Sequence, residues 1–450
     1  MFLGVESSVT GKCWRQRPAD ERLGLGLAQR FDLPEIIGRL LAGRGITEDN
    51  AEDFLDPRLA SSLPDPAHLL GMEDAVDRIA LAVEKGQAIC VFGDYDVDGA
   101  TSSALLSRFF RALGMDIRVY IPDRIKEGYG PNQAALDMLR SDGAELLITV
   151  DCGTNAFEPL ARAAGQGLDV IVLDHHIAEA HLPDAVAVIN PNRIDDDSPH
   201  KQLAAVGVTF LLIVAVNRAL RDGGFYAKDN SPAEPNLMQW LDLVALGTVA
   251  DVVSLTGVNR AFVTQGLKVL ARRANTGLAA LSDAAGIDET PGAYHLGFIL
   301  GPRINAGGRV GESALGARLL ASDDAIEATR IATQLDQYNR ERRNIEAAVL
   351  AQALESTPEA GQTRGGVFAM GQGWHPGVIG IVASRLVERF DQPAFVISLG
   401  EDGTGVASAR SMPGIDLGAM VSAARQKGLL LAGGGHAMAA GFTVGLEHLK

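Results

Sequence analysis

The sequence has few cysteines, few aromatic residues and no excess of positive charge, and each shortage excludes a class of protein. Its three cysteines, Cys13, Cys90 and Cys152, show no CxxC spacing and are too few for a disulfide framework, so we expect a reducing compartment, by default the cytoplasm. Aromatic residues make up 5% of the chain, which limits stacking as a main source of affinity. The net charge of −16 argues against a general basic coat but allows a local basic groove.

Long apolar segments are also scarce. The longest run, residues 203–216, is shorter than the ~20 residues that a transmembrane helix needs. The N-terminus has no continuous apolar stretch of the kind found in signal peptides. We therefore expect no membrane association. Glycine, in contrast, is abundant: its 51 copies are about 11% of the chain, against roughly 7% on average, which favours a loop-rich α/β enzyme.

The 450 residues are too many for one typical domain, and the hydrophobic pattern divides them into four parts. Residues 1–71 predict a helical N-terminal region. Residues 72–275 alternate short β-branched runs with helical patterns, which is typical of a doubly wound, mainly parallel sheet. Residues 276–355 predict a helical connector that includes a long helix from Asp323 to about Leu354, and residues 356–450 predict a smaller α/β domain. The predicted fold class is α/β.

Acidic and histidine residues gather at predicted strand and helix ends of the second part. The first strand, residues 88–92, is followed by GDYDVDG; later strands end at VDCG and LDHH, and an apolar helix ends at GTVAD. The candidate metal ligands in these segments are Asp94, Asp96, Asp98, Asp151, His175 and Asp251. Because the carboxyl ends of parallel strands meet at one edge of a sheet, we expect these side chains to lie close together.

Clustered carboxylates repel one another unless a cation lies between them. An oxygen-rich set with one or two imidazoles suits Mn²⁺ or Mg²⁺ better than Zn²⁺. Since there are more carboxylates than one ion needs, we predict two divalent ions that share an aspartate, an arrangement typical of phosphoester hydrolysis. A calcium loop also begins with DxDxDG, but it requires a glutamate where Leu105 stands. Singly, each ligand also has a structural interpretation, as a turn cap, a loop histidine or a helix-end charge.

The same segments resemble the four motifs of the DHH phosphoesterase superfamily, named after the triplet at residues 174–176. GGGHAMAAG at residues 433–441 resembles its DHHA1 domain. EGYGPN, NPNR, GPRINAGGR, WHPGVIGIVASRLVE and ASARS resemble the RecJ family of single-strand-specific exonucleases. The resemblance covers about residues 70–450. It implies a DHH catalytic domain joined by a long helix to a DHHA1 domain, and 5′→3′ hydrolysis of single-stranded DNA to 5′-mononucleotides in DNA repair and recombination.

The resemblance also implies a role for each candidate ligand. Two ions would be held, with Asp151 bridging them, by Asp94 and Asp96 on one side and by Asp98, His175 and Asp251 on the other. His176 would contact the scissile phosphate or the leaving oxygen; its structural alternative is to orient His175. Asp151 and His176 are therefore the candidate catalytic residues.

Further motifs are expected to contact the bound DNA strand. GPRINAGGR places small residues between arginines, so that its backbone can approach phosphate. The glycines before His436 are expected to form an anion-binding nest. The predicted contacts to the strand or to its 5′-phosphate are Arg124, Arg303, Asn305, Arg309, Ser408, Arg410 and His436. Arg124 could instead form a surface salt bridge, and His436 could be structural.

Two other functions stay open at this point. A phosphodiesterase or phosphatase of the same superfamily, acting on small nucleotides or very short RNA, would keep the metals without an end-binding pocket. A non-catalytic scaffold would have lost a ligand, whereas every motif position here is filled. Family members usually continue into an OB-fold, so we expect this chain to be either truncated or a minimal form. We also expect a monomer, and a single-strand-binding protein and a helicase as partners.

Overall fold

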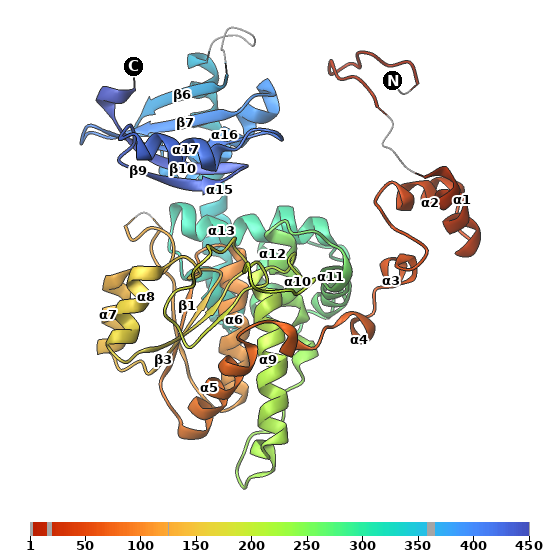
Figure 1. Ribbon diagram of the computed structural model, residues 1–450, viewed down its shortest axis with the longest axis vertical. Coiled ribbons are helices and arrows are strands. Elements are labelled where there is room, and N and C mark those ends of the chain that lie inside the picture. The colour runs from red at the N-terminus through yellow and green to blue at the C-terminus, as the bar shows by residue number, and fades with distance from the viewer. Residues whose placement is uncertain (1–2, 16–19, 125, 358–364, 450) are drawn as a thin grey trace.

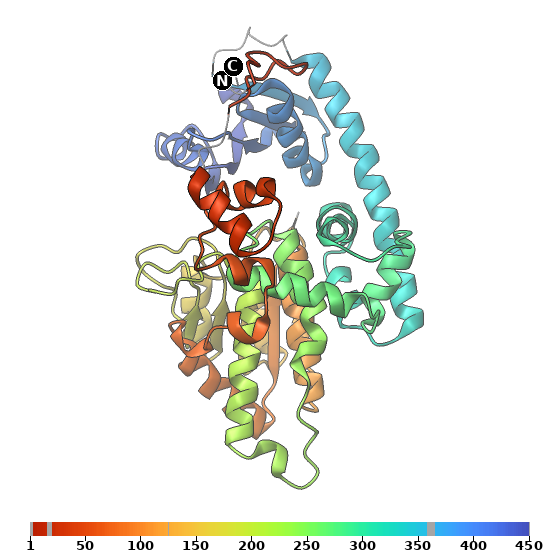
Figure 2. The same cartoon turned by 90° about the vertical axis from the view of Figure 1, so that its right-hand side faces the viewer.

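The computed structural model describes residues 3–15, 20–124, 126–357 and 365–449, and these form two α/β bodies joined by one long helix (Figure 1). Each body contains a five-stranded sheet. Helix α15 (Ala325–Ser356) runs from the first body to the second, as the view in Figure 2 shows along one side of the molecule. The predicted α/β class and the long linking helix are confirmed.

All strand pairs of the first sheet are parallel, in the order β2-β1-β3-β4-β5. The strands are β1 (Ile89–Gly93), β2 (Arg118–Tyr120), β3 (Leu146–Val150), β4 (Asp169–Leu173) and β5 (Ala187–Ile189). Every residue of β1 and β3 is buried, as expected for strands covered on both faces. Because β2 and β3 lie on opposite sides of β1, the winding direction switches between β1 and β3. Sheets of this order bind ligands at such a point.

Helices cover both faces of the first sheet. α7 (Gln133–Ser141) and α8 (Phe157–Gly165) pack on one face, and α5 (Met72–Lys85), α6 (Val97–Ala112) and α9 (Ala205–Asp222) pack on the other. The longest apolar run of the sequence thus forms most of a core helix, α9. Within the described residues, no helix has both the length and the apolar character needed to cross a membrane.

A helical layer follows the first sheet along the chain. Its members are α10 (Leu241–Ala250), α11 (Gly257–Leu270), α12 (Thr276–Ala284), the π-helical segment η4 (His295–Leu300), α13 (Gly301–Val310) and α14 (Leu315–Ala321). The N-terminal helices lie at the right of Figure 1. They are α1 (Glu21–Arg30), α2 (Glu35–Ala42), α3 (Ala51–Leu55) and α4 (Leu59–Ser62). Of these, α3 and α4 contact α11, while α1 and α2 pack mainly on each other.

The second sheet is mixed, in the order β6-β7-β8-β10-β9, with β6 and β7 parallel and the other pairs antiparallel. Its strands are β6 (Val367–Gln372), β7 (Ala394–Leu399), β8 (Thr404–Arg410), β9 (Ala432–His436) and β10 (Ala439–Gly445). α16 (Pro376–Phe390) and α17 (Leu417–Gln426) pack on it. The anion-binding nest predicted before His436 is wrong: these glycines form strand β9, whose backbone pairs with β10.

Candidate metal centre and anion pocket

The predicted metal ligands meet at the carboxyl edge of the first sheet. Asp94 follows β1, Asp151 follows β3, and Asp251 ends α10. Three groups of possible ligands form among the described residues, in each of which one atom per residue lies within 4.8 Å of the others. Two of them, called the two ligand groups below, are Asp94, Asp96 and Asp151, and Asp98, His175 and Asp251; the third consists of Asp151, His175 and His176 and overlaps both. These two ligand groups match the two sets of metal ligands that the motifs predict. They lie at the switch point between β1 and β3.

Two helix N-termini hold the carboxylates of the first motif. Asp96 caps α6, and its Oδ1 accepts hydrogen bonds from the N–H groups of Asp98 (2.8 Å) and Gly99 (3.1 Å). Asp98 is 1% exposed, and its carboxylate accepts hydrogen bonds from the N–H groups of Ala205 (2.6 Å) and Val206 (2.9 Å) at the start of α9. Since helix N-termini favour negative charge, this packing fixes both carboxylates beside the sheet.

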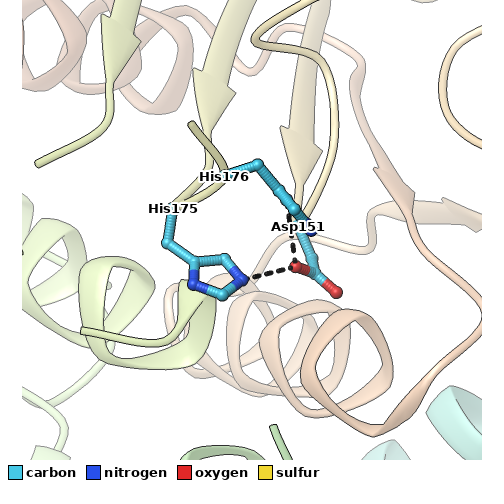
Figure 3. Close-up of side chains that lie close together, drawn as sticks. All are labelled: Asp151, His175 and His176. Atoms are coloured by element: carbon cyan, nitrogen blue, oxygen red, sulfur yellow. Dashed lines mark ion pairs between the residues drawn. The ribbon is translucent and has the colours of Figure 1, made fainter. Parts of the chain in front are cut away.

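Asp151 lies at the centre of the cluster in a strained conformation. Its φ of +61° is uncommon for a residue other than glycine, and such outliers gather at functional sites. Figure 3 shows the His175 ring pointing toward its carboxylate; Nε2 lies 3.3 Å from Asp151 Oδ1. The same Nε2 atom is 3.8 Å from Asp98 Oδ2 and 3.7 Å from Asp251 Oδ2. One imidazole nitrogen therefore faces three carboxylates.

Several buried atoms at this centre have no hydrogen-bond partner. Among the described residues, Asp94 Oδ1, Asp151 Oδ1, His175 Nε2 and Asp251 Oδ2 are buried with no hydrogen-bond partner. Buried polar atoms are normally satisfied, so four such atoms in one cluster require an explanation. Carboxylate oxygens with one imidazole are a donor set that Mn²⁺ or Mg²⁺ accepts. The residues present therefore fit divalent cations.

When no cation is bound, burial also favours the protonated form of the carboxyl groups in this cluster. Burial, together with the charge of Asp251, raises the pKa of Asp98 to about 7. Burial, together with the charge of Asp96, raises the pKa of Asp251 to about 7 as well. The pKa values of Asp94 and Asp151 lie well above their usual range for the same two reasons.

The buried carboxylate of Asp174 orients His176. Asp174 Oδ1 lies 2.7 Å from His176 Nδ1 and also accepts the N–H groups of His175 and His176. Burial lowers the pKa of His176, but the hydrogen bond and charge of Asp174 outweigh it and raise this pKa to about 9. The Tyr129 hydroxyl donates to the backbone oxygen of Asp151 (2.9 Å) and lies 3.3 Å from His176 Nδ1. The Asp-His-His triplet could be found in the sequence. The contacts of Asp174 and Tyr129 with His176 could not, and they are visible only in the structure.

A pocket of about 570 Å³ opens beside the carboxylates, and three arginines line it. Arg124 comes from the first body, Arg309 from α13 and Arg410 from the end of β8, and the same pocket contacts Asn305 and His436. Burial and the charges of neighbouring arginines, Arg124 among them, lower the pKa of Arg309 to about 10 and also lower that of Arg410. Like charges brought together in a partly buried pocket are stabilised by an anion.

Other residues position these arginines. The Ser408 hydroxyl accepts a hydrogen bond of 3.1 Å from Arg410 Nη1. Gly380 on α16 faces the pair: a Cβ atom there would lie 2.9 Å from Arg410 Nη2 and from Ser408 Oγ. The Arg124 guanidinium lies 5.0 Å from the centre of the Tyr95 ring.

Arg303, predicted to contact the strand, is placed elsewhere. Its buried guanidinium donates to Asp336 Oδ1 (2.9 Å) on α15 and to the backbone oxygen of Ile299 (2.7 Å). Arg303 and Arg309 are six residues apart on α13, which is about one and two-thirds turns, so they point to different sides. The expectation that this motif brings its backbone close to phosphate is also wrong. It forms a helix, and its small residues allow close packing: a Cβ on Gly308 would lie 2.9 Å from the backbone oxygen of Tyr95.

Comparison with known proteins supplies the family. The DHH family N-terminal domain matches residues 88–248, and the DHHA1 domain matches residues 362–450. The single-stranded-DNA-specific exonuclease RecJ of Salmonella typhimurium is 40% identical over 439 residues, covering 96% of this chain and 74% of that protein. The chain belongs to the RecJ family.

Solved structures of the RecJ family agree with this fold. RecJ of Thermus thermophilus in complex with Mn²⁺ superposes with a TM-score of 0.79, and its complex with Mg²⁺ with a TM-score of 0.73. Both are 32% identical to this chain; they cover 95% of it and 59% and 57% of their own chains. The chain thus spans about three quarters of the Salmonella RecJ and less than two thirds of the Thermus chains. The family resemblance that the motifs predict is confirmed.

Proposed function

We propose that this chain hydrolyses single-stranded DNA from its 5′ end and releases 5′-mononucleotides, using two divalent ions. The observation that carries the proposal is the juxtaposition of the two ligand groups with a pocket lined by three arginines. A terminal nucleotide has a phosphate at each side, one at its 5′ end and one that joins it to the next residue. The arginine pocket would hold the 5′-phosphate, and the two ligand groups would hold the ions that act on the phosphate between the first two nucleotides.

The two ligand groups would hold Mn²⁺ or Mg²⁺. Asp94 and Asp96 would bind one ion, Asp98, His175 and Asp251 the other, and Asp151 would bridge them. When bound, the ions would supply an activated water and stabilise charge on the entering and leaving oxygens. Support comes from the unpartnered buried atoms of this cluster and from the RecJ structures that contain Mn²⁺ or Mg²⁺.

His176 would act on the phosphate that is cut. Its Nδ1 is held by Asp174, which leaves Nε2 for a contact outside this network. Hydrolysis joins the water oxygen to phosphorus and breaks the bond to the 3′ oxygen of the terminal nucleotide. That 3′ oxygen must gain a proton, and His176 is placed to donate a hydrogen bond to it or to the scissile phosphate.

The arginine pocket would hold the 5′-phosphate. Arg410, supported by Ser408, and Arg124 face it from the two bodies, while Arg309, Asn305 and His436 complete its wall. Guanidinium groups bind phosphate in bidentate fashion, so three of them can fix the strand end before cleavage. Such a pocket favours a strand end over a cyclic dinucleotide, which has no terminal phosphate.

Digestion of labelled DNA tests this function. A 5′-phosphorylated single strand with a 3′ fluorophore should shorten stepwise from its 5′ end in Mn²⁺, whereas the same strand in a duplex and a cyclic dinucleotide should resist. Asp151→Asn should abolish cleavage, and Asp184→Asn, which alters an exposed carboxylate outside the cluster, should not. Cleavage of the dinucleotide alone would show that the substrate is a small nucleotide.

We further propose that the active unit is a cytoplasmic monomer with the four parts 1–71, 72–275, 276–355 and 356–450. One chain supplies every residue of the two ligand groups and of the arginine pocket, so the proposed site needs no residue from a second copy. Because a strand-specific enzyme needs its substrate exposed, a helicase would open the duplex and a single-strand-binding protein would keep the strand accessible.

A further inference from the structure

A continuous helical segment leads away from the arginine pocket. Residues 293–310 are helical throughout, with η4 joined directly to α13. Asn305 and Arg309 line the pocket at the end of this segment that contacts α16, where Arg309 Nη1 donates to the Gly377 backbone oxygen (3.1 Å). In Figure 1, α13 lies between the body of the first sheet and that of the second.

The other end of the segment carries two exposed rings. Tyr294 is 63% exposed and Phe298 is 67% exposed, which makes them the most exposed Phe, Tyr or Trp side chains among the described residues. Their rings are stacked, with centroids 5.3 Å apart and planes at 24°. An apolar surface of this kind, left open to water, indicates an interaction site.

Helical spacing places these rings on the side of the helix that faces the pocket. Phe298 precedes Asn305 by seven residues and Arg309 by eleven, and most of both intervals lies in α13, where such spacings keep side chains near one face. Tyr294 joins this face through its stacking on Phe298 across the π-helical turn. A π-helical turn, as in η4, occurs frequently at functional sites. The segment also packs on the end of α10: a Cβ on Gly297 would lie 3.3 Å from Val249 Cγ1, two residues before Asp251.

The spacing along the helix sets the reach of a bound strand. Eleven residues at 1.5 Å each place Phe298 about 16 Å from Arg309 along the axis. At 3.4 Å per nucleotide of a stacked strand, this distance corresponds to about five nucleotides. A more extended strand would cover the distance with fewer. A strand whose 5′-phosphate lies in the arginine pocket would thus bring its third to sixth bases to the rings.

We propose that Tyr294 and Phe298 form a stacking platform for these bases of single-stranded DNA. The inference rests on the proposed function and adds a subsite to it. The platform suits bases better than phosphates, because the neighbouring His295 is paired with Glu289 (3.1 Å), which places a carboxylate rather than a free cation beside the rings. Stacking on an aromatic face tolerates any base, as an enzyme that degrades arbitrary sequences requires.

Binding to a strand that resists cleavage tests the platform. The ligand is a 5′-phosphorylated thymidine 12-mer with phosphorothioate linkages in Mn²⁺, measured by fluorescence anisotropy against a 12-mer that is abasic at positions 3–6. The double variant Tyr294→Leu/Phe298→Leu should bind the complete strand about 10-fold or more weakly than wild type. The two proteins should bind the abasic strand equally. Phe298→Trp, which keeps a ring, should retain the affinity.

Controls separate this inference from the proposed function. Phe368→Leu removes another exposed ring, on β6 of the second sheet, and should leave binding unchanged. The double variant should cleave a 5′-phosphorylated trinucleotide at the wild-type rate, since that substrate is too short to cover the platform. If wild type cleaves DNA and the double variant binds the complete strand as wild type does, the platform is wrong. If wild type cleaves no DNA of any length, the proposed function fails instead.

Discussion

Arg303 and Arg309 belong to one motif on one helix, yet their surroundings give them different tasks. Arg303 is buried in an ion pair with Asp336, whereas Arg309 lines the anion pocket. We expect Arg303→Ala to destabilise the protein by about 1.5–3 kcal/mol, because it removes the buried guanidinium that donates to Asp336 and leaves this carboxylate only its ion pair with the exposed Arg340 (2.6 Å). We expect Arg309→Ala to leave stability nearly unchanged and to raise the KM for a 5′-phosphorylated strand at least about 10-fold, since it removes a contact to phosphate.

Chemical denaturation and steady-state kinetics on both variants test whether Arg303 serves stability and Arg309 serves substrate binding. The double variant Arg303→Met/Asp336→Leu serves as a control, because it removes both charges of the pair and should recover much of the lost stability. A rise in KM with no loss of stability in Arg303→Ala would show that this guanidinium contacts the strand after all.

At the scale of elements, α15 connects the metal centre to part of the anion pocket. Arg410 lies on β8 of the second body, which meets the first body through α15 and through the contact of α16 with α13, so its distance from the carboxylates depends in part on a straight α15. Proline at the exposed position Ala347 would break the helix between the bodies at a cost of about 3 kcal/mol or more. We expect Ala347→Pro to reduce cleavage of single-stranded DNA at least about 10-fold while Mn²⁺ binding, measured by calorimetry, persists.

Ala347→Gly is the matched control for the helix break. Glycine costs only about 1 kcal/mol in a helix interior and does not force a kink, so cleavage should stay close to that of wild type. Equal activity of the proline and glycine variants would mean that the second body does not need to be held in register with the first.

The elements that could be predicted from sequence are those that local pattern determines. Buried β-branched runs predicted the strands of the first sheet, and because parallel strand ends converge, their order alone placed Asp94, Asp151 and His175 together. What could not be predicted depends on packing between distant segments. Arg303 and Arg309 point to different sides because of their spacing on the helix α13. The glycines before His436 form a strand instead of the expected nest because they pair with β10.

At the scale of the whole molecule, the metal centre couples folding to pH. The pKa of Asp98 and that of Asp251 are raised to about 7 in the folded protein, against about 4 in an unfolded chain. Between about pH 4 and pH 7, these two carboxyl groups therefore bind protons more tightly in the folded state than in the unfolded state. The resulting stabilisation is complete below about pH 4 and is lost as the pH rises through 7.

We therefore expect the metal-free protein to be more stable at pH 5.5 than at pH 8, with a thermal midpoint that differs by about 5 °C or more. Mn²⁺ takes the place of the protons, so its addition should raise the midpoint more at pH 8 than at pH 5.5. Calorimetric scans in EDTA and in Mn²⁺ at both pH values measure the effect. Asp251→Asn, which cannot ionise, should flatten part of the pH dependence in EDTA. A midpoint in EDTA that rises toward pH 8 would mean that the buried carboxylates are paired within the protein itself, and that cations are not what balances their charge.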